Sequence, residues 1–256
     1  MKLARLLLIG TWLQLKMRSR SAFEGVLGLV YPLFFATTVF LMFRQGGESK
    51  ALVSAAVGAS VMGVWSAVST TASTALQSER RQGTLELLVA SPTPFPLIVV
   101  PITVSMSIVG LWSMLATLLW GRWVFGINVR IDDPAGFVAA AVVTVLAISL
   151  VGYLLAVSAV RYRSAWALGT AFELPVWLIC GFLVPLSQLP DWVLPLSWAL
   201  PPTWGVSAVK AAADGRSPWV DILVCLAVAL CYAVLATALS TKLLRSARAA
   251  ATLALT

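Results

Sequence analysis

The sequence lacks histidine and is poor in charged residues. Its 256 residues include 10 acidic and 18 basic side chains, so charged residues make up 11% of the chain. Ordinary soluble domains carry roughly a quarter charged residues, and a chain this poor in charge cannot cover a globular surface with polar groups. Without histidine or a cluster of metal ligands, the sequence also gives no basis for an enzyme active site.

Cysteine is scarce, and the phosphate loop of ATPases is missing. The three cysteines, Cys180, Cys225 and Cys231, all lie in apolar runs, so we interpret them as packing residues with no redox or metal role. The pattern G-x-x-x-x-G-K-[ST], which cradles nucleotide phosphates, does not occur. We therefore expect no enzyme activity, no ATP site and no cofactor in this chain.

Apolar residues are abundant: 60% of the chain is hydrophobic and the mean hydropathy is +0.93. A bilayer core about 30 Å thick needs roughly 20 apolar residues per helix. The apolar runs are continuous rather than alternating, which predicts helices and not a barrel. We predict an all-α membrane protein, a single transmembrane domain over 1–256, with six spans at about Ala22–Phe43, Leu52–Leu76, Leu97–Trp120, Gly136–Val160, Ser164–Leu186 and Trp219–Leu243.

Residues 1–20 mix basic side chains with leucines and a tryptophan. This pattern predicts a helix in the plane of the membrane interface, with its apolar face toward lipid and its basic side chains toward headgroups. The alternative is a disordered basic tail.

The distribution of lysine and arginine predicts the orientation. With the N-terminus inside, the cytoplasmic segments hold twelve basic residues and the outer segments six. An even number of spans with both termini cytoplasmic satisfies the preference for positive charge inside. The net charge of +8 is then explained by cytoplasmic loops and anionic lipid, and no nucleic-acid partner is expected.

Residues 77–92 form a charged island between the second and third spans. Gly83 permits a turn, Thr84 can cap the helix that follows, and Glu86 then sits in its first turn, where negative charge is favourable. Leu85 and two later apolar residues fall on one helical face. The pattern predicts a short amphipathic helix that docks in a groove of a soluble partner, the alternative being an ordinary polar connector.

The same island resembles the coupling loop of the ABC-2-type transporter permeases. In that family a run of acidic and basic residues is followed by G-T-L-E, an apolar pair and a Ser-Pro break. The matching residues are Glu79, Arg80, Gly83, Thr84, Leu85, Glu86, Leu87, Ser91 and Pro92. Arg81 departs from the pattern, because many members carry a second acid there. The resemblance implies that the ATPase-coupling residues are Glu79, Arg80, Arg81, Gly83, Thr84, Leu85, Glu86 and Leu87.

Residues 187–205 are similar to the extracellular re-entrant hairpin of the same family. Prolines such as Pro190, Pro201 and Pro202 are expected to break the helix repeatedly, while Trp192 and Trp204 keep the segment at the interface. The resemblance thus extends over nearly the whole chain.

The resemblance implies the permease subunit of an ATP-driven ABC exporter in the plasma membrane of a bacterium. Its expected partners are the lipid bilayer, two copies of a nucleotide-binding subunit that bind ATP and Mg, and a second permease, identical or related. The expected cargo is amphipathic or lipidic: a drug, an antibiotic, a lipid or a lipid-linked glycan.

Two other functions stay open. A non-transporting anchor or immunity component would use the coupling loop only to hold an ATPase. A secondary transporter driven by an ion gradient would need more intramembrane ionisable groups and inverted repeats.

Glu173 is the one acid well inside a predicted span, where charge is costly. We interpret it as a contact for cationic cargo or a salt-bridge gate, the alternative being a structural contact to a hydroxyl of the second span. Trp65 and Trp177 line a hydrophobic path or simply pack. With Ser66 and Thr70 of the second span, these residues are our cargo-pathway candidates.

Overall fold

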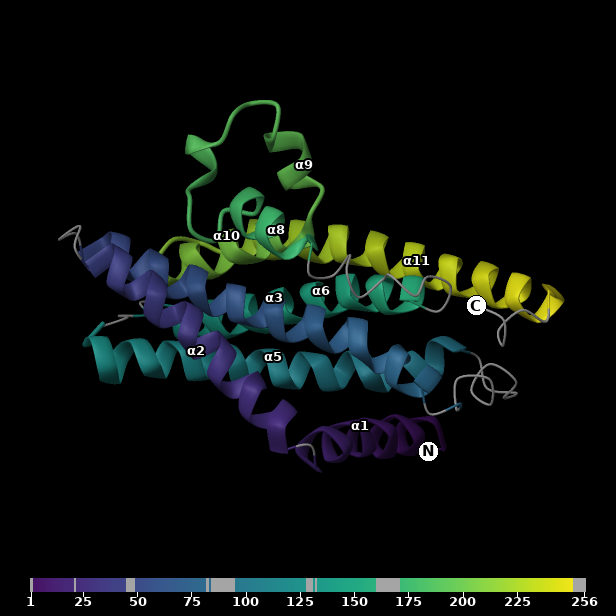
Figure 1. Ribbon diagram of the computed structural model, residues 1–256. Coiled ribbons are helices and arrows are strands. Elements are labelled where there is room, and N and C mark those ends of the chain that lie inside the picture. Colours follow the sequence, from purple (N-terminus) through teal and green to yellow (C-terminus); the bar gives the residue numbers. More distant parts are fainter. Residues whose placement is uncertain are drawn as a thin grey trace.

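The chain folds into a bundle of long helices, shown in the computed structural model of Figure 1. The structure describes residues 2–20, 22–44, 49–81, 83, 95–127, 131, 133–159 and 171–250, and these contain no strand. Four long helices lie side by side, namely α3 (Ser49–Arg81), α5 (Phe95–Phe125), α6 (Pro134–Ala159) and α11 (Trp219–Ala250). Helix α2 (Ala22–Arg44) packs across α3 and α5.

Each of the four long helices contains an apolar stretch long enough to cross a bilayer. These stretches are Leu52–Ser69, Val100–Phe125, Pro134–Val157 and Trp219–Lys242, and they confirm helices at the second, third, fourth and sixth predicted spans. The stretch in α3 is 78% buried and that in α11 is 22% buried, so α3 forms the centre and α11 the periphery. Cys180 and Cys225 are buried, but Cys231 on α11 is exposed, so its assignment as a packing residue was wrong.

Small residues let the other helices approach α3 closely. A Cβ atom placed on Gly63 would lie 2.8 Å from the Ser113 hydroxyl of α5 and 3.1 Å from Pro32 of α2. Membrane helices commonly use small residues at such crossings, because they allow backbones to come close. The small-residue composition of the second predicted span thus corresponds to a central position in the bundle.

Helices α1 (Lys2–Arg20) and α2 occupy the predicted interfacial helix and first span. Helix α1 packs on α5, where a Cβ on Gly10 would lie 2.9 Å from the ring of Pro101. Its apolar side chains Leu8 and Trp12 stay exposed, as a helix lying on lipid requires. The long apolar stretch described within α2 is Pro32–Phe43, so its role as a span stays a prediction.

The predicted fifth span ends earlier than expected. Helix α8 (Glu173–Ile179) has seven residues and stops well before Leu186, while residues 160–170 lie outside the described part. The chain turns at Cys180 and Gly181, and Gly181 adopts a φ of 76°, a left-handed conformation that glycine accepts without strain. The continuous helix expected up to Leu186 was therefore wrong.

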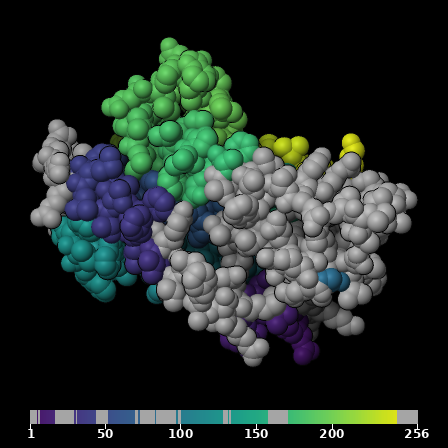
Figure 2. Space-filling model, in the orientation of Figure 1, coloured from purple at the N-terminus to yellow at the C-terminus, as the bar shows by residue number. Residues whose placement is uncertain are grey.

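The segment after α8 stands out from the side of the bundle (Figures 1 and 2). It contains a 3₁₀ turn, η1 (Leu186–Gln188), and the short helix α9 (Leu194–Trp198), and it returns as α10 (Pro201–Ala213). We expected the prolines in 187–205 to break helices, but the Pro201-Pro202 pair starts one. Proline suits the first helical positions because their N–H groups have no partner within the helix.

The start of α1 and the ends of α3 and α11 lie at the same end of the bundle (Figure 1). This agrees with both termini being on one side of a membrane. The assignment of that side to the cytoplasm, and the count of six spans, stay predictions.

The turn after α8 packs directly on the centre of the bundle. A Cβ atom placed on Gly58 of α3 would lie 1.8 Å from the carbonyl oxygen of Phe182. The obstructing atom belongs to the backbone, so rotation of a side chain cannot relieve the overlap. Glycine is therefore required at this position for the observed packing of α3 against the turn.

We expect Gly58→Ala to destabilise the protein by about 1–3 kcal/mol, the usual cost of overpacking a tight core. Thermal unfolding of the purified protein in detergent measures the effect. Gly121→Ala is the matched control, because its Cβ meets only side-chain atoms, the ring of Phe40 at 3.1 Å and Ile127 at 3.5 Å, and should cost less. Equal stability of the two variants would contradict the close contact at Gly58.

Candidate functional site

Glu173 and Ser66, two of the predicted cargo-pathway residues, are in direct contact. Glu173 is the first residue of α8, and the Ser66 hydroxyl of α3 donates a hydrogen bond to its carboxylate oxygen Oε1. This is the contact to a hydroxyl of the second span that the sequence left open as an alternative. Among the residues that the structure describes, no basic side chain forms an ion pair with Glu173.

Two tryptophans neighbour the members of this contact along their helices. Trp177 lies one turn after Glu173, on the same face of α8. Its ring meets that of Phe35 on α2 edge to face, with 5.0 Å between the centroids. Trp65 precedes Ser66 on α3, and both tryptophans belong to the hydrophobic core of the bundle.

The indole N–H groups of both tryptophans are buried without a hydrogen-bond partner among the described residues. Trp177 is 6% exposed and Trp65 is 3% exposed, and the Nε1 atom of each has no hydrogen-bond partner among the described residues. A buried donor without a partner costs about 1–3 kcal/mol. Thr70, the remaining candidate, lies one turn after Ser66 on α3, and its side chain is outside the described part of the structure.

Lys210 of α10 holds the other end of α8, a role that the sequence analysis missed. Its Nζ atom donates hydrogen bonds to the carbonyl oxygens of Gly181 at 2.8 Å and Phe182 at 3.2 Å. Burial lowers the pKa of Lys210 to about 8 and outweighs the attraction of Asp214. The sequence feature that could have indicated this role is a single lysine within a run rich in valine and alanine.

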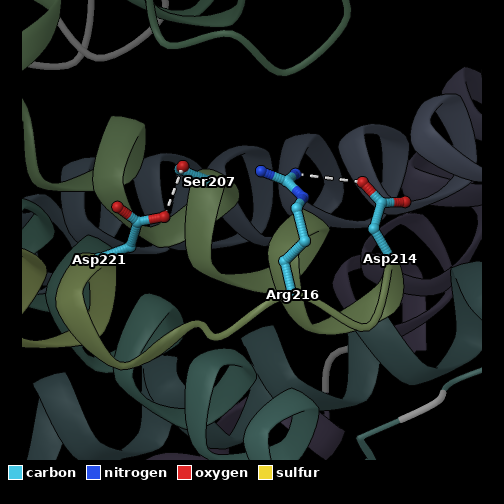
Figure 3. Close-up of polar contacts among 4 residues, drawn as sticks. All are labelled: Ser207, Asp214, Arg216 and Asp221. Atoms are coloured by element: carbon cyan, nitrogen blue, oxygen red, sulfur yellow. Dashed lines mark hydrogen bonds and ion pairs between the residues drawn. The ribbon is translucent and has the colours of Figure 1, made fainter.

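Polar contacts join the end of α10 to the start of α11 (Figure 3). The Ser207 hydroxyl donates to Asp221 at 2.7 Å, and Arg216 pairs with Asp214 at 3.1 Å. The second pair is exposed, so it contributes little stability. The Ser207–Asp221 hydrogen bond links α10, which carries Lys210, to α11.

The predicted coupling loop begins on a helix. Glu79, Arg80 and Arg81 form the end of α3, which continues five residues beyond the predicted limit of the second span. Gly83 lies in a turn with a φ of 69°, which confirms the predicted turn. The other coupling residues, Thr84, Leu85, Glu86 and Leu87, lie outside the described residues.

One helix therefore carries three of these features. Helix α3 contains Glu79 to Arg81 at its end, Ser66 near its middle and Gly58 eight residues further toward its start. In α8 and the turn after it, the contacts follow the opposite order. The earlier residue, Glu173, meets Ser66, whereas the later residue, Phe182, meets Gly58. The two segments therefore run antiparallel and touch at two points.

The sequence profile described as ABC-2 type transporter matches residues 5–213, from the first turn of α1 to the end of α10. The chain belongs to the ABC-2 type transporter family. This ABC-2 permease thus belongs to a family of transmembrane transporter subunits. With its apolar helices, family membership also indicates a multi-pass membrane protein.

A curated relative of this ABC-2 permease is the linearmycin resistance permease protein LnrN of Bacillus subtilis (strain 168). The two sequences are 23% identical over 203 residues, which cover 79% of this chain and 52% of the relative. The chain thus spans about half the length of the relative that it matches.

We expect Lys210→Met to destabilise the permease at neutral pH by about 1–3 kcal/mol, because it leaves two buried carbonyl groups without their donor. The pKa of Lys210 is lower in the folded protein than the usual 10.5. The unfolded chain therefore binds more protons between about pH 8 and 10.5, and the stability contributed by Lys210 rises with pH across that window.

Thermal unfolding of wild type and variant between pH 7.5 and about 10 checks this prediction. The difference in midpoint should grow with pH, and Lys210→Arg, which keeps a donor but stays charged, should not reproduce the growth. A difference that is independent of pH would refute the titration of a buried lysine.

Proposed function

We propose that this ABC-2 permease is the transmembrane subunit of an ATP-driven exporter that moves an amphipathic or lipidic compound out of a bacterial cell. A separate ATPase, present in two copies, binds ATP and Mg²⁺ and supplies the energy. A second permease, identical or related, completes the pathway in the plasma membrane.

The continuity of α3 is the observation that carries this proposal. The helix runs without interruption from Arg81, beside the predicted coupling segment, to Ser66 and Gly58. At about 1.5 Å per residue, Arg81 and Ser66 are separated by roughly 22 Å along the helix axis. A push on the end of α3 reaches the contact with Glu173 through a single rigid element.

We assign the contact with the ATPase, where this force is applied, to the coupling segment from Glu79 to Leu87. In the proposed function, Glu79, Arg80 and Arg81 at the end of α3 contact the ATPase together with Thr84, Leu85, Glu86 and Leu87. The turn at Gly83 redirects the chain immediately after α3, so the two parts of the contact are joined by a short connection. Family membership supports this assignment, because it implies an ABC ATPase as partner.

Two observations bear on the nature of the cargo. The relative from Bacillus subtilis is named for resistance to linearmycin. This name supports a cargo whose removal protects the cell, and the apolar bundle supports a molecule that partitions into lipid. Glu173, Ser66, Trp65, Trp177 and Thr70 stay our candidates for the pathway.

The experiment is purification of the permease with its ABC ATPase, followed by reconstitution in lipid vesicles. We expect the charge reversals Glu79→Lys and Glu86→Lys to reduce recovery of the ATPase by about tenfold or more, since one buried charge pair at an interface is worth at least that factor. ATP hydrolysis stimulated by cargo should fall in parallel.

Asp191→Lys is the matched control. Asp191 is exposed in the segment between α8 and α10, away from the coupling end. The same change of charge there should leave ATPase recovery intact. Unchanged recovery and stimulation in the Glu79 and Glu86 variants would rule out the proposed coupling. An ATPase that binds but never drives transport would instead indicate an anchor.

A further inference from the structure

The carboxylate of Glu173 is incompletely satisfied. Ser66 donates to Oε1, and this is the only polar contact of the carboxylate among the described residues. Lys210, which holds the other end of α8, is engaged by the carbonyl groups of Gly181 and Phe182. A carboxylate in apolar surroundings is stable only with a cation, further donors or a proton.

The surroundings of this carboxylate suit a cation of organic type. Trp177 lies on the same face of α8, and Phe35 meets the Trp177 ring at 5.0 Å. Aromatic faces attract ammonium groups, and the attraction increases when water is excluded. A site with one carboxylate and nearby aromatic rings favours an alkylated or protonated amine. A small hydrated metal ion would need several oxygen ligands.

The unpartnered indole of Trp177 is a second, independent observation. Its Nε1 atom is buried and donates to none of the described residues, although it lies only one turn from Glu173. A donor of this kind gains a partner when a molecule carrying an oxygen acceptor binds beside the carboxylate. The site then offers one negative group, neighbouring aromatic rings and an N–H donor that has no partner among the described residues.

The opposite side of α8 adds an apolar surface. Phe172, Leu174 and Leu178 are all more than half exposed. On α2, Phe34 is 67% exposed and lies next to Phe35, the residue that meets Trp177. A hydrocarbon tail can therefore lie along the outside of α2 and α8 while a headgroup reaches the carboxylate.

We propose that Glu173, held by Ser66 and one helical turn before the Trp177 that packs on Phe35, binds the positively charged amine of an amphiphilic cargo. The amine takes the carboxylate oxygen that Ser66 leaves free, and the ring faces exclude water around it. This inference rests on the proposed function, because it names the class of cargo for the same permease.

The first experiment uses the wild-type permease alone, in lipid nanodiscs. Dicyclohexylcarbodiimide, which reacts with carboxyl groups in apolar surroundings, labels Glu173, and mass spectrometry measures the labelling rate. We expect dodecyltrimethylammonium to slow labelling by about tenfold, the size of effect that one desolvated cation contact provides. An uncharged polyoxyethylene dodecyl ether, with the same tail, should not protect.

The second experiment uses the reconstituted complex with its ATPase. Dodecyltrimethylammonium should stimulate ATP hydrolysis in the wild type, and Glu173→Gln, which keeps the size and the acceptor for Ser66, should lose about nine-tenths of the stimulation if the tenfold contact is lost. Asp191→Asn removes an exposed acid as the matched control and should keep the stimulation.

The outcomes separate the two proposals. Equal protection by both probes, or none by the ammonium, overturns the cation site whatever the ATPase does. Full stimulation of Glu173→Gln also overturns it. Protection by the ammonium without stimulation in any variant supports the cation site and counts against the exporter function.

Discussion

The close approach of two backbones at Gly58 determines how the outer part of this permease is arranged. The Phe182 carbonyl lies against α3 where a side chain would stand, and Lys210 of α10 donates to the same carbonyl. Helix α8, the turn after it and α10 are thereby joined to the centre of the bundle. The contact of Glu173 with Ser66 depends on this arrangement, because α8 is too short to hold its own position.

Hydropathy predicted the long apolar helices, whether central or peripheral in the bundle, and it failed for the short helices between α6 and α11. The helices α3, α5, α6 and α11 each contain about twenty apolar residues and were found at the expected places. Helix α10 was missed because its thirteen residues are too few for a span and begin with two prolines that suggested a break. The early end of α8 depends on the turn at Gly181, which composition does not reveal.

The candidate site was predictable in part. An acid within an apolar stretch demands a partner, and a hydroxyl of α3 was the alternative to the predicted contact with cationic cargo. The choice of Ser66 among several such residues follows from the register between α3 and α8, which is set by contacts far apart in the sequence. Lys210 was beyond prediction for the same reason, since its partners are backbone carbonyl groups that no residue type identifies.

The antiparallel contacts of α3 with α8 also restrict how the bundle can move. A slide of α3 by one helical turn, about 5.4 Å, would bring either Met62 or Ser54 opposite the Phe182 carbonyl in place of Gly58. Neither side chain fits where even a methyl group overlaps the oxygen. The two helices are therefore locked in a single register. Any displacement that starts at Arg81 must tilt or rotate them as one body, and Glu173 changes its surroundings without leaving Ser66.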